Sequence, residues 1–290
     1  MSSTSKALLD EPQMPETSAI KVSQPKKNVY HVCFNRPKFK NAVNDEIWRE
    51  LRLIFDYLSV CPDCRSIVLS GSENAFCSGL DVKTTLPQLL GVTEDSNLDI
   101  GRKALILRRL IKQCQESISS IENCQKPVIA AICGPCVGAG ISIASATDIR
   151  YASDDAVFSV KEVDLGITAD VGFLNRINKL VGNDSVVREW TYTGRQFDSA
   201  EALLFGFVSK VISRASCLDE SLNLAATIAE KSPTTVIGAK LLLNIARDHT
   251  VTDSLEFIKS WNQAFLQSDD LKQAAAAMLS RTKPKFRDLQ

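Results

Sequence analysis

Residues 128–146 of the chain read Val-Ile-Ala-Ala-Ile-Cys-Gly-Pro-Cys-Val-Gly-Ala-Gly-Ile-Ser-Ile-Ala-Ser-Ala. The stretch begins with a short apolar run, residues 128–132, which predicts a buried strand. Glycines then mark a turn, and residues 141–146 predict a helix of small side chains. A strand that passes through a glycine turn into a helix is typical of an α/β fold. Small residues in such a turn let a ligand approach the backbone and leave N–H groups free at the start of the helix.

Short strands and helices alternate on both sides of this unit. Further strands are predicted at residues 29–34, 66–70, 149–152 and 156–160. Helices are predicted at residues 45–59 with Asn44 as the N-cap, and at 102–121, 221–230, 234–247 and 251–266. We therefore expect an α/β core over residues 26–217 and a helical region over residues 218–290. Residues 1–25, rich in Ser, Thr, Pro and Gln, are expected to form a disordered tail.

Composition excludes several classes of function. The chain has 290 residues, 44% of them hydrophobic, and its 34 basic residues balance 34 acidic ones. This balance gives no indication of a nucleic-acid partner or of an anionic membrane surface. No apolar run reaches the roughly 18–20 residues of a membrane span. Neither end shows a signal peptide, a typical transit peptide or the usual peroxisomal tripeptide, so the termini predict no compartment.

Cysteines are numerous and include two C-x-x-C pairs, Cys61 with Cys64 and Cys133 with Cys136. A zinc site would require the two pairs to meet in space. A thiol redox site would require Cys133 at an exposed helix N-terminus. However, Cys133 ends an apolar strand, and Ile132 replaces the tryptophan of thioredoxin-type sites. Buried free thiols are therefore the favoured interpretation, and no metal site is expected.

Two carboxyl groups, Glu162 and Asp170, stand eight residues apart in an apolar setting directly after the strand at 156–160. Loops that follow strands are a common place for chemistry in α/β folds. Two carboxyl groups that face one pocket can take a proton from one carbon and return one to another. The alternatives are that Asp170 caps a helix starting near Val171 and that Glu162 is a solvated loop residue.

Two turns with small residues, residues 74–82 and 133–140, add a second element of a site. Neither is a P-loop or a G-x-G-x-x-G motif. One N–H group from each turn could together hold an oxyanion, which is a large contribution in acyl chemistry. Two ordinary tight turns are the alternative.

Several motifs together resemble the enoyl-CoA hydratase/isomerase (crotonase) superfamily. They are Asn35-Arg36-Pro37 with Asn41-Ala42, Phe76-Cys77-Ser78-Gly79-Leu80-Asp81, Lys126-Pro127-Val128-Ile129-Ala130-Ala131, the glycine turn and Asp148-Ile149-Arg150. Within the superfamily, three segments resemble the dienoyl-CoA isomerases. They are residues 160–172, Arg247-Asp248-His249 and Ser260-Trp261-Asn262. The resemblance runs from about Val29 to about Leu271.

The resemblance implies a spiral of β-β-α turns with a C-terminal helical trimerisation region, and trimers that pair into hexamers. It implies an acyl-CoA thioester as substrate, with no cofactor beyond the CoA of the substrate and no metal. The N–H groups of Leu80 and Ala139 would hold the thioester oxygen. Glu162 would serve C2 and Asp170 would serve C6, with the reverse order left open. Residues expected to line the substrate are Ser78, Gly79, Leu80, Asp81 and Val82.

The activity implied is isomerisation of 3,5-dienoyl-CoA to 2,4-dienoyl-CoA in unsaturated fatty-acid degradation, in mitochondria or peroxisomes. Alternatives are another crotonase-type enzyme, such as a Δ3,Δ2-enoyl-CoA isomerase or a hydratase, and a non-catalytic acyl-CoA-binding protein. Two residues depart from the family pattern. Ser142 replaces an acidic residue, so hydratase activity is expected to be lost. Ala139 replaces a glycine, and its methyl group is expected to narrow the pocket or to resist a positive φ.

Overall fold

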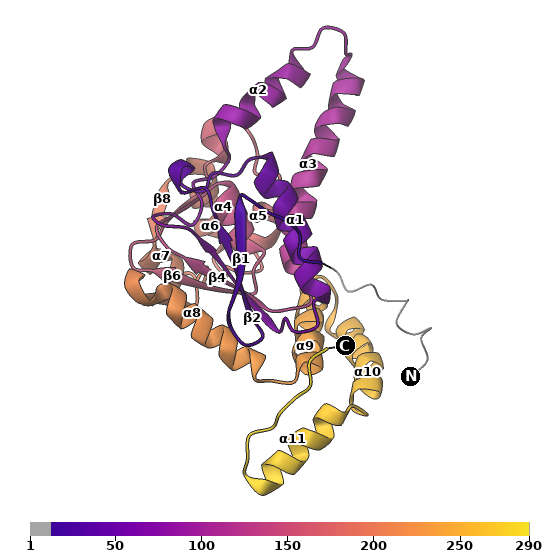
Figure 1. Ribbon diagram of the computed structural model, residues 1–290. Helices are drawn as coiled ribbons and strands as arrows, with labels where there is room; N and C mark the ends of the chain where they lie inside the picture. The colour runs from indigo at the N-terminus through magenta and orange to yellow at the C-terminus, as the bar shows by residue number, and fades with distance from the viewer. Residues whose placement is uncertain (1–12, 290) are drawn as a thin grey trace.

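Strands from distant parts of the sequence form one six-stranded sheet in the computed structural model, which describes residues 13–289 (Figure 1). The order across the sheet is β1-β2-β3-β4-β6-β9; β1 is antiparallel to β2, and the other neighbours are parallel. A second sheet has the order β5-β7-β8. The strands are Ile20–Lys26 (β1), Val29–Phe34 (β2), Ser66–Gly71 (β3), Val128–Ile132 (β4), Pro135–Val137 (β5), Ile149–Ser153 (β6), Val157–Ser159 (β7), Gln196–Asp198 (β8) and Lys210–Ile212 (β9).

Helices connect the strands and cover both faces of the large sheet. The α-helices are Asp45–Val60 (α1), Val82–Thr93 (α2), Ile100–Asn123 (α3), Ala139–Ser145 (α4), Phe173–Ile177 (α5), Asp184–Thr193 (α6), Ser199–Leu204 (α7), Arg214–Ala229 (α8), Pro233–Ala246 (α9), Val251–Phe265 (α10) and Asp269–Ser280 (α11). Short 3-10 helices are Pro37–Phe39 (η2) and Glu162–Leu165 (η3). Helices α2 and α3 project together from the body at the top of Figure 1. Over residues 13–289, none of the helices combines the length and apolar character needed to cross a membrane.

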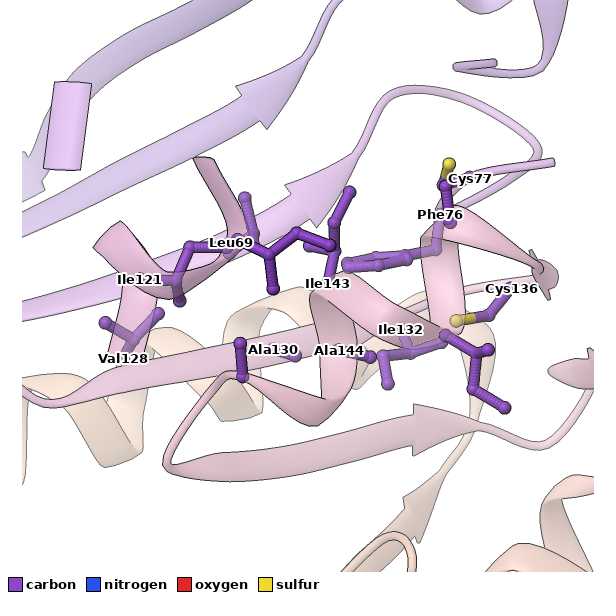
Figure 2. Close-up of a cluster of buried hydrophobic side chains, with 14 of the residues drawn as sticks. Leu69, Phe76, Cys77, Ile121, Val128, Ala130, Ile132, Cys136, Ile143 and Ala144 are labelled. Atoms are coloured by element: carbon purple, nitrogen blue, oxygen red, sulfur yellow. The ribbon is translucent and has the colours of Figure 1, made fainter. Parts of the chain in front are cut away.

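The position of β4 inside the sheet, between β3 and β6, explains why its sequence is apolar without interruption. All five of its residues are buried, because helices pack on both faces of a parallel sheet. Ala130 and Ile132 face a large core shared with α1, α3 and α4, part of which is drawn in Figure 2. Ile129 and Ala131 face the opposite side, where they pack with residues of α8. The strand–turn–helix unit predicted for residues 128–146 is therefore confirmed.

The two sheets arise from a repeated β-β-α path. Strand β4 continues into β5, and β6 continues into β7, so that the pairs β4–β6 and β5–β7 stack in parallel. Cys77, after β3, forms a parallel bridge with Cys136 of β5, which adds a third layer to the stack. This is the spiral of β-β-α turns expected from the family resemblance.

The expectation of a disordered tail over residues 1–25 is wrong for its last part. Residues 20–26 form β1, while residues 1–12 lie outside the described residues. The cause is Glu50 of α1, whose side chain is buried and accepts hydrogen bonds from the backbone N–H groups of Ser18, Ala19 and Ile20 at 2.9, 3.0 and 2.9 Å. A polar segment is thus ordered by a carboxylate that lies far away in the sequence.

The C-terminal helices match the prediction with two corrections. The predicted boundary between residues 217 and 218 falls inside α8, which begins at Arg214 directly after β9. Helix α11 was not predicted as a separate element. Beyond α11 the chain returns to the sheet, where Arg65 donates to the carbonyl of Phe286 at 2.7 Å and pairs with Asp288 at 2.8 Å. The predicted N-cap Asn44 is confirmed by its bond from the Ile47 N–H at 3.1 Å.

Replacing Glu50 by Gln is expected to lower the free energy of unfolding by about 1–3 kcal/mol, because an amide cannot accept all of the buried N–H groups that the carboxylate serves. Urea unfolding followed by circular dichroism measures the change. Glu46→Gln is the matched control, since Glu46 lies one turn earlier on α1 and bonds only to the exposed hydroxyl of Ser18. Equal stability of Glu50→Gln and wild type would contradict this account of β1.

Candidate active site

The first turn of the site follows β3 and presents one free N–H group. The Val43 N–H donates to the Gly79 carbonyl, and the Asp81 N–H donates to the Val43 carbonyl, both at 2.8 Å. The C=O and N–H of one trans peptide point in opposite directions. Because the Gly79 carbonyl points at Val43, the N–H of Leu80 points away from it. Leu80 lines a cavity of about 270 Å³.

The second turn joins β5 to α4 and presents the other N–H group. Gly138 donates its N–H to the Ser159 carbonyl at 2.9 Å and takes the positive φ of 52°. Ala139 is the first residue of α4, where backbone N–H groups have no partner within the helix. Ala139 does not have a positive φ, so the expectation that its methyl group would resist the backbone is wrong. Its methyl group lines the same cavity as Leu80.

The two turns touch at their glycines. A Cβ built on Gly138 would lie 3.7 Å from the Cα of Gly79, and one built on Gly79 would lie 3.2 Å from the carbonyl oxygen of Val137. Gly79 also has a positive φ of 99°. A side chain at Gly79 would therefore be strained and would separate the turns that carry the two N–H groups.

Glu162 lies beside the second turn. Its Oε1 would be 3.9 Å from a Cβ on Gly138, and its Oε2 is buried without a hydrogen-bond partner in the described structure. Burial raises the pKa of Glu162, and the charge of Asp170 raises it further. The alternative that Glu162 is a solvated loop residue is therefore wrong.

Asp170 lines the same cavity from the loop between η3 and α5. The N-cap position of helix α5 is Gly172, and no side chain caps the helix. The alternative that Asp170 caps this helix is therefore wrong. The Asp170 carbonyl accepts a hydrogen bond from Gln115 at 2.7 Å. Burial also raises the pKa of Asp170. The cavity thus holds two carboxyl groups whose protonated forms persist to higher pH than in water.

The structure brings most of the predicted substrate-lining residues together. Ser78, Gly79, Leu80 and Val82 line the cavity with Ala139. Asp81 does not, because its side chain is buried against Arg36, with a nitrogen–oxygen distance of 2.9 Å. Asp81 therefore anchors the first turn to the Asn-Arg-Pro turn. The apolar wall of the cavity was not predicted; it is formed by Trp48, Val137, Leu165, Ile167 and Val171.

The C-x-x-C cysteines do not form a thioredoxin-like pair. Cys136 is buried in the large core with Cys77, whereas Cys133 packs on the other side of the sheet with Cys217. A hydrogen bond from Cys217 lowers the pKa of Cys133 to about 7. Burial raises the pKa of Cys77 to about 12. Across residues 13–289, no group of three or more Cys, His, Asp or Glu side chains could hold a metal ion.

The model of the enoyl-CoA hydratase/isomerase family matches residues 24–289 of the sequence. The chain belongs to this family. It is 43% identical to the mitochondrial Δ3,5-Δ2,4-dienoyl-CoA isomerase of Mus musculus, over 91% of this chain and 80% of that one. It is 41% identical to the peroxisomal Δ3,5-Δ2,4-dienoyl-CoA isomerase of Arabidopsis thaliana, over 90% of this chain and 94% of that one. The resemblance seen in the sequence is therefore confirmed.

Solved structures show the same fold. An enoyl-CoA hydratase from Bacillus anthracis superposes with a TM-score of 0.84 at 23% identity, covering 93% of this chain and 99% of that one. An enoyl-CoA hydratase from Polaromonas sp. JS666 superposes with a TM-score of 0.82 at 25% identity, covering 93% of this chain and 100% of that one. The predicted crotonase-type architecture is confirmed.

Glu162→Gln is expected to melt at a higher temperature than wild type at pH 7, since the neutral amide avoids the cost of an ionised carboxylate in the cavity. A raised pKa in the folded state means that this cost appears as the pH rises above the ordinary Glu value. The difference in melting temperature should therefore shrink as the pH falls to about 4, near the ordinary Glu value. Thermal scans at several pH values measure it. A lower melting temperature for the variant at pH 7 would contradict the burial of this carboxylate.

Proposed function

We propose that this protein isomerises 3,5-dienoyl-CoA to 2,4-dienoyl-CoA, the reaction for which its relatives from Mus musculus and Arabidopsis thaliana are named. The observation that carries the proposal is that Glu162 and Asp170 line one cavity together with Leu80 and Ala139, whose N–H groups lack backbone partners there. This arrangement supports acyl chemistry with two proton carriers. It supports a binding-only role less well, because a pure binding site has no use for two carboxyl groups with raised pKa values in one cavity.

The N–H groups of Leu80 and Ala139 would receive the carbonyl oxygen of the thioester. When a proton leaves C2, negative charge moves onto this oxygen, and two fixed donors stabilise it. Both donors belong to a backbone that the Gly79–Gly138 contact already holds in place. Little reorganisation is therefore needed at the moment of reaction.

Glu162 would take the C2 proton, because its carboxylate lies beside Gly138 and hence next to the Ala139 N–H. The electron pair of the broken C–H bond then spreads over the dienolate. The Asp170 carboxyl group would donate a proton at C6, which forms the new C–H bond and leaves the 2,4-diene. One proton is removed and one is added, so the substrate undergoes no net oxidation. The raised pKa values suit both roles, since a base works best near the working pH and an acid must hold its proton.

The remaining walls suit an acyl chain and disfavour hydration. Trp48, Ile167 and Val171 present apolar surface to the cavity. Ser142 of α4 is fully buried, and its Oγ has no hydrogen-bond partner in the described structure. Ser142 does not line the cavity, and a hydroxyl cannot act as a second carboxylate that would help Glu162 to activate a water molecule. Isomerisation is therefore favoured over hydration.

Assembly and location are part of the same proposal. Large apolar side chains are exposed on the C-terminal helices, among them Val251, Leu255, Leu271, Met278 and Leu279. Such exposed apolar surface favours burial against other copies of the chain. We propose a homotrimer or a homohexamer. A mitochondrial or peroxisomal location is proposed from the names of the relatives.

With 3,5-octadienoyl-CoA as substrate, wild-type protein is expected to produce the absorbance of the conjugated 2,4-dienoyl thioester. Glu162→Gln and Asp170→Asn are each expected to lower kcat by about 100- to 10,000-fold, as for the loss of a general acid or base. Asp164→Asn is the matched control, since Asp164 also lines the cavity but pairs with Lys161 at 2.6 Å near the surface. Its kcat should stay close to that of wild type.

One result would refute this function, and a second would refute its two-carboxylate mechanism. A flat trace for wild-type protein that still binds CoA esters would indicate a binding protein. Full activity in Asp170→Asn would eliminate the second proton carrier and leave a one-carboxylate isomerase.

Asp170→Asn should also lower the pKa of Glu162, because the Asp170 charge contributes to raising it. Exchange of the C2 proton with deuterated solvent reports the ionised form of Glu162. In the variant, this exchange should persist to lower pH than in wild type, and NMR of the CoA ester measures it. A shift toward higher pH, or none, would mean that the two carboxyl groups do not interact.

A further inference from the structure

The Asp170 loop, residues 170–172, is the last part of the segment 166–172 that connects η3 to α5, and it has no regular secondary structure. Val171 of this loop lines the catalytic cavity. Val171 and Gly172 also line a second, polar cavity of about 490 Å³. The loop therefore borders both cavities. A loop without regular secondary structure needs contacts with neighbouring elements to keep Asp170 at the catalytic cavity.

Arg176 of α5 holds the Asp170 loop through a hydrogen bond to its backbone. The residue is 9% exposed, and its Nη1 donates to the Gly172 carbonyl at 3.1 Å. Gly172 has a positive φ of 114°, and a Cβ built there would lie 2.0 Å from the Nη1 of Arg176. Only glycine therefore allows both the loop conformation and the approach of the guanidinium group.

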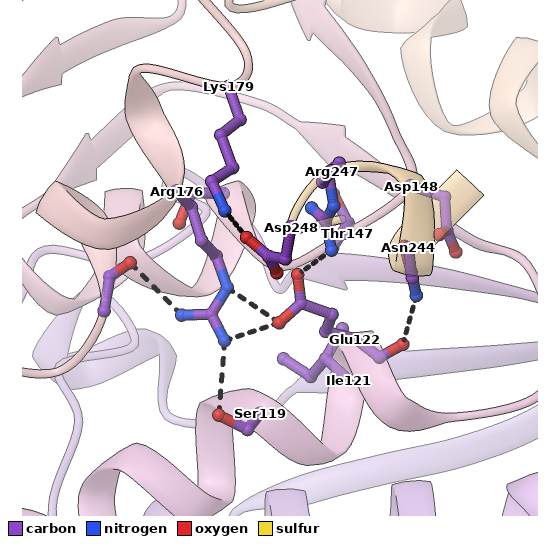
Figure 3. A network of polar contacts seen from close by, with 12 residues as sticks. Ser119, Ile121, Glu122, Thr147, Asp148, Arg176, Lys179, Asn244, Arg247 and Asp248 are labelled. Atoms are coloured by element: carbon purple, nitrogen blue, oxygen red, sulfur yellow. Dashed lines mark hydrogen bonds and ion pairs between the residues drawn. The ribbon is translucent and has the colours of Figure 1, made fainter. Parts of the chain in front are cut away.

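Glu122 of α3 fixes the direction of Arg176 (Figure 3). The Nε and Nη2 atoms of Arg176 donate to Glu122 Oε2 at 3.1 and 2.8 Å, and Nη2 also donates to Ser119 at 3.2 Å. The other oxygen of Glu122 accepts a hydrogen bond from Arg247, the residue directly after α9. Burial alone would raise the pKa of Glu122, but the two arginines lower it overall, so the carboxylate stays ionised.

We propose that Arg176, oriented by Glu122, is a positioning residue that holds Asp170 against the substrate. The planar guanidinium makes all of these contacts at once, which a single ammonium group cannot do. The positioning role rests on the proposed function, since it concerns the delivery of a proton by Asp170. Arg176 itself does not line the catalytic cavity.

The test compares Arg176→Lys with Arg247→Lys. Both variants keep a positive charge near Glu122, but only Arg176 contacts the loop. Two rates are measured for each: conversion of 3,5-octadienoyl-CoA, which needs both carboxyl groups, and exchange of the C2 proton with deuterated solvent, which needs Glu162 and the two N–H groups. Melting temperatures of the variants are measured alongside.

In Arg176→Lys, conversion is expected to fall on the order of 100-fold, as for a displacement of about 1 Å in a reacting group, while C2 exchange stays within about three-fold of wild type. This split matches the pattern expected of Asp170→Asn. Arg247→Lys should keep both rates. Glu122→Gln, which preserves shape, should show the same split and provides the test if Arg176→Lys does not fold.

Unchanged conversion in Arg176→Lys, or an equal loss of both rates, would overturn the positioning role, since an equal loss indicates general damage to the fold. Failure of the proposed function has a different pattern. In that case wild type and Arg247→Lys both lack conversion. If instead Asp170→Asn converts at the wild-type rate, the isomerase function stands, but Asp170 delivers no proton and the positioning role falls.

Discussion

The contact between the backbones of two turns is the constraint on which the rest of the site depends. Cys77 donates its N–H to the Pro135 carbonyl at 3.0 Å and accepts the Val137 N–H at 2.9 Å. Close approach also requires Gly140, where a Cβ would lie 2.8 Å from the Cβ of Cys77. With these contacts, the N–H groups at Leu80 and Ala139 belong to one rigid unit. The β-β-α spiral is the means of stacking layers closely enough for this.

The two N–H groups are held by a rigid backbone, whereas the two carboxyl groups are held by segments with little regular structure. Glu162 belongs to a short 3-10 helix and Asp170 to a loop. Such segments can reach into a cavity from a sheet edge, which a strand interior cannot do. They need support from neighbouring elements, which Gln115 and Arg176 provide. Rigid backbone donors and supported loop acids thus divide the work of one site.

Sequence patterns predicted the parts of the fold that depend on residues close together in the chain. The buried strands β3 and β4 and the capped helix α1 follow from apolar runs and from Asn44, and about half of the residues that line the cavity follow from the motif match. Contacts between distant segments were not predictable. The order of β1 depends on Glu50, and the exclusion of Asp81 from the cavity depends on Arg36. The ion pair of Arg176 with Glu122 likewise joins helices whose neighbourhood no spacing in the sequence reveals.

The buried thiols on the two turns have a practical consequence. Cys77 and Cys136 are both fully buried, pair with each other in a parallel backbone bridge, and have pKa values raised by burial. A thiol of this kind reacts with an alkylating agent only when the surrounding structure opens. The native chain therefore carries its own chemical reporters of site integrity. Their labelling rate, measured separately from that of the other cysteines, would report how often the two turns separate, without any residue being replaced.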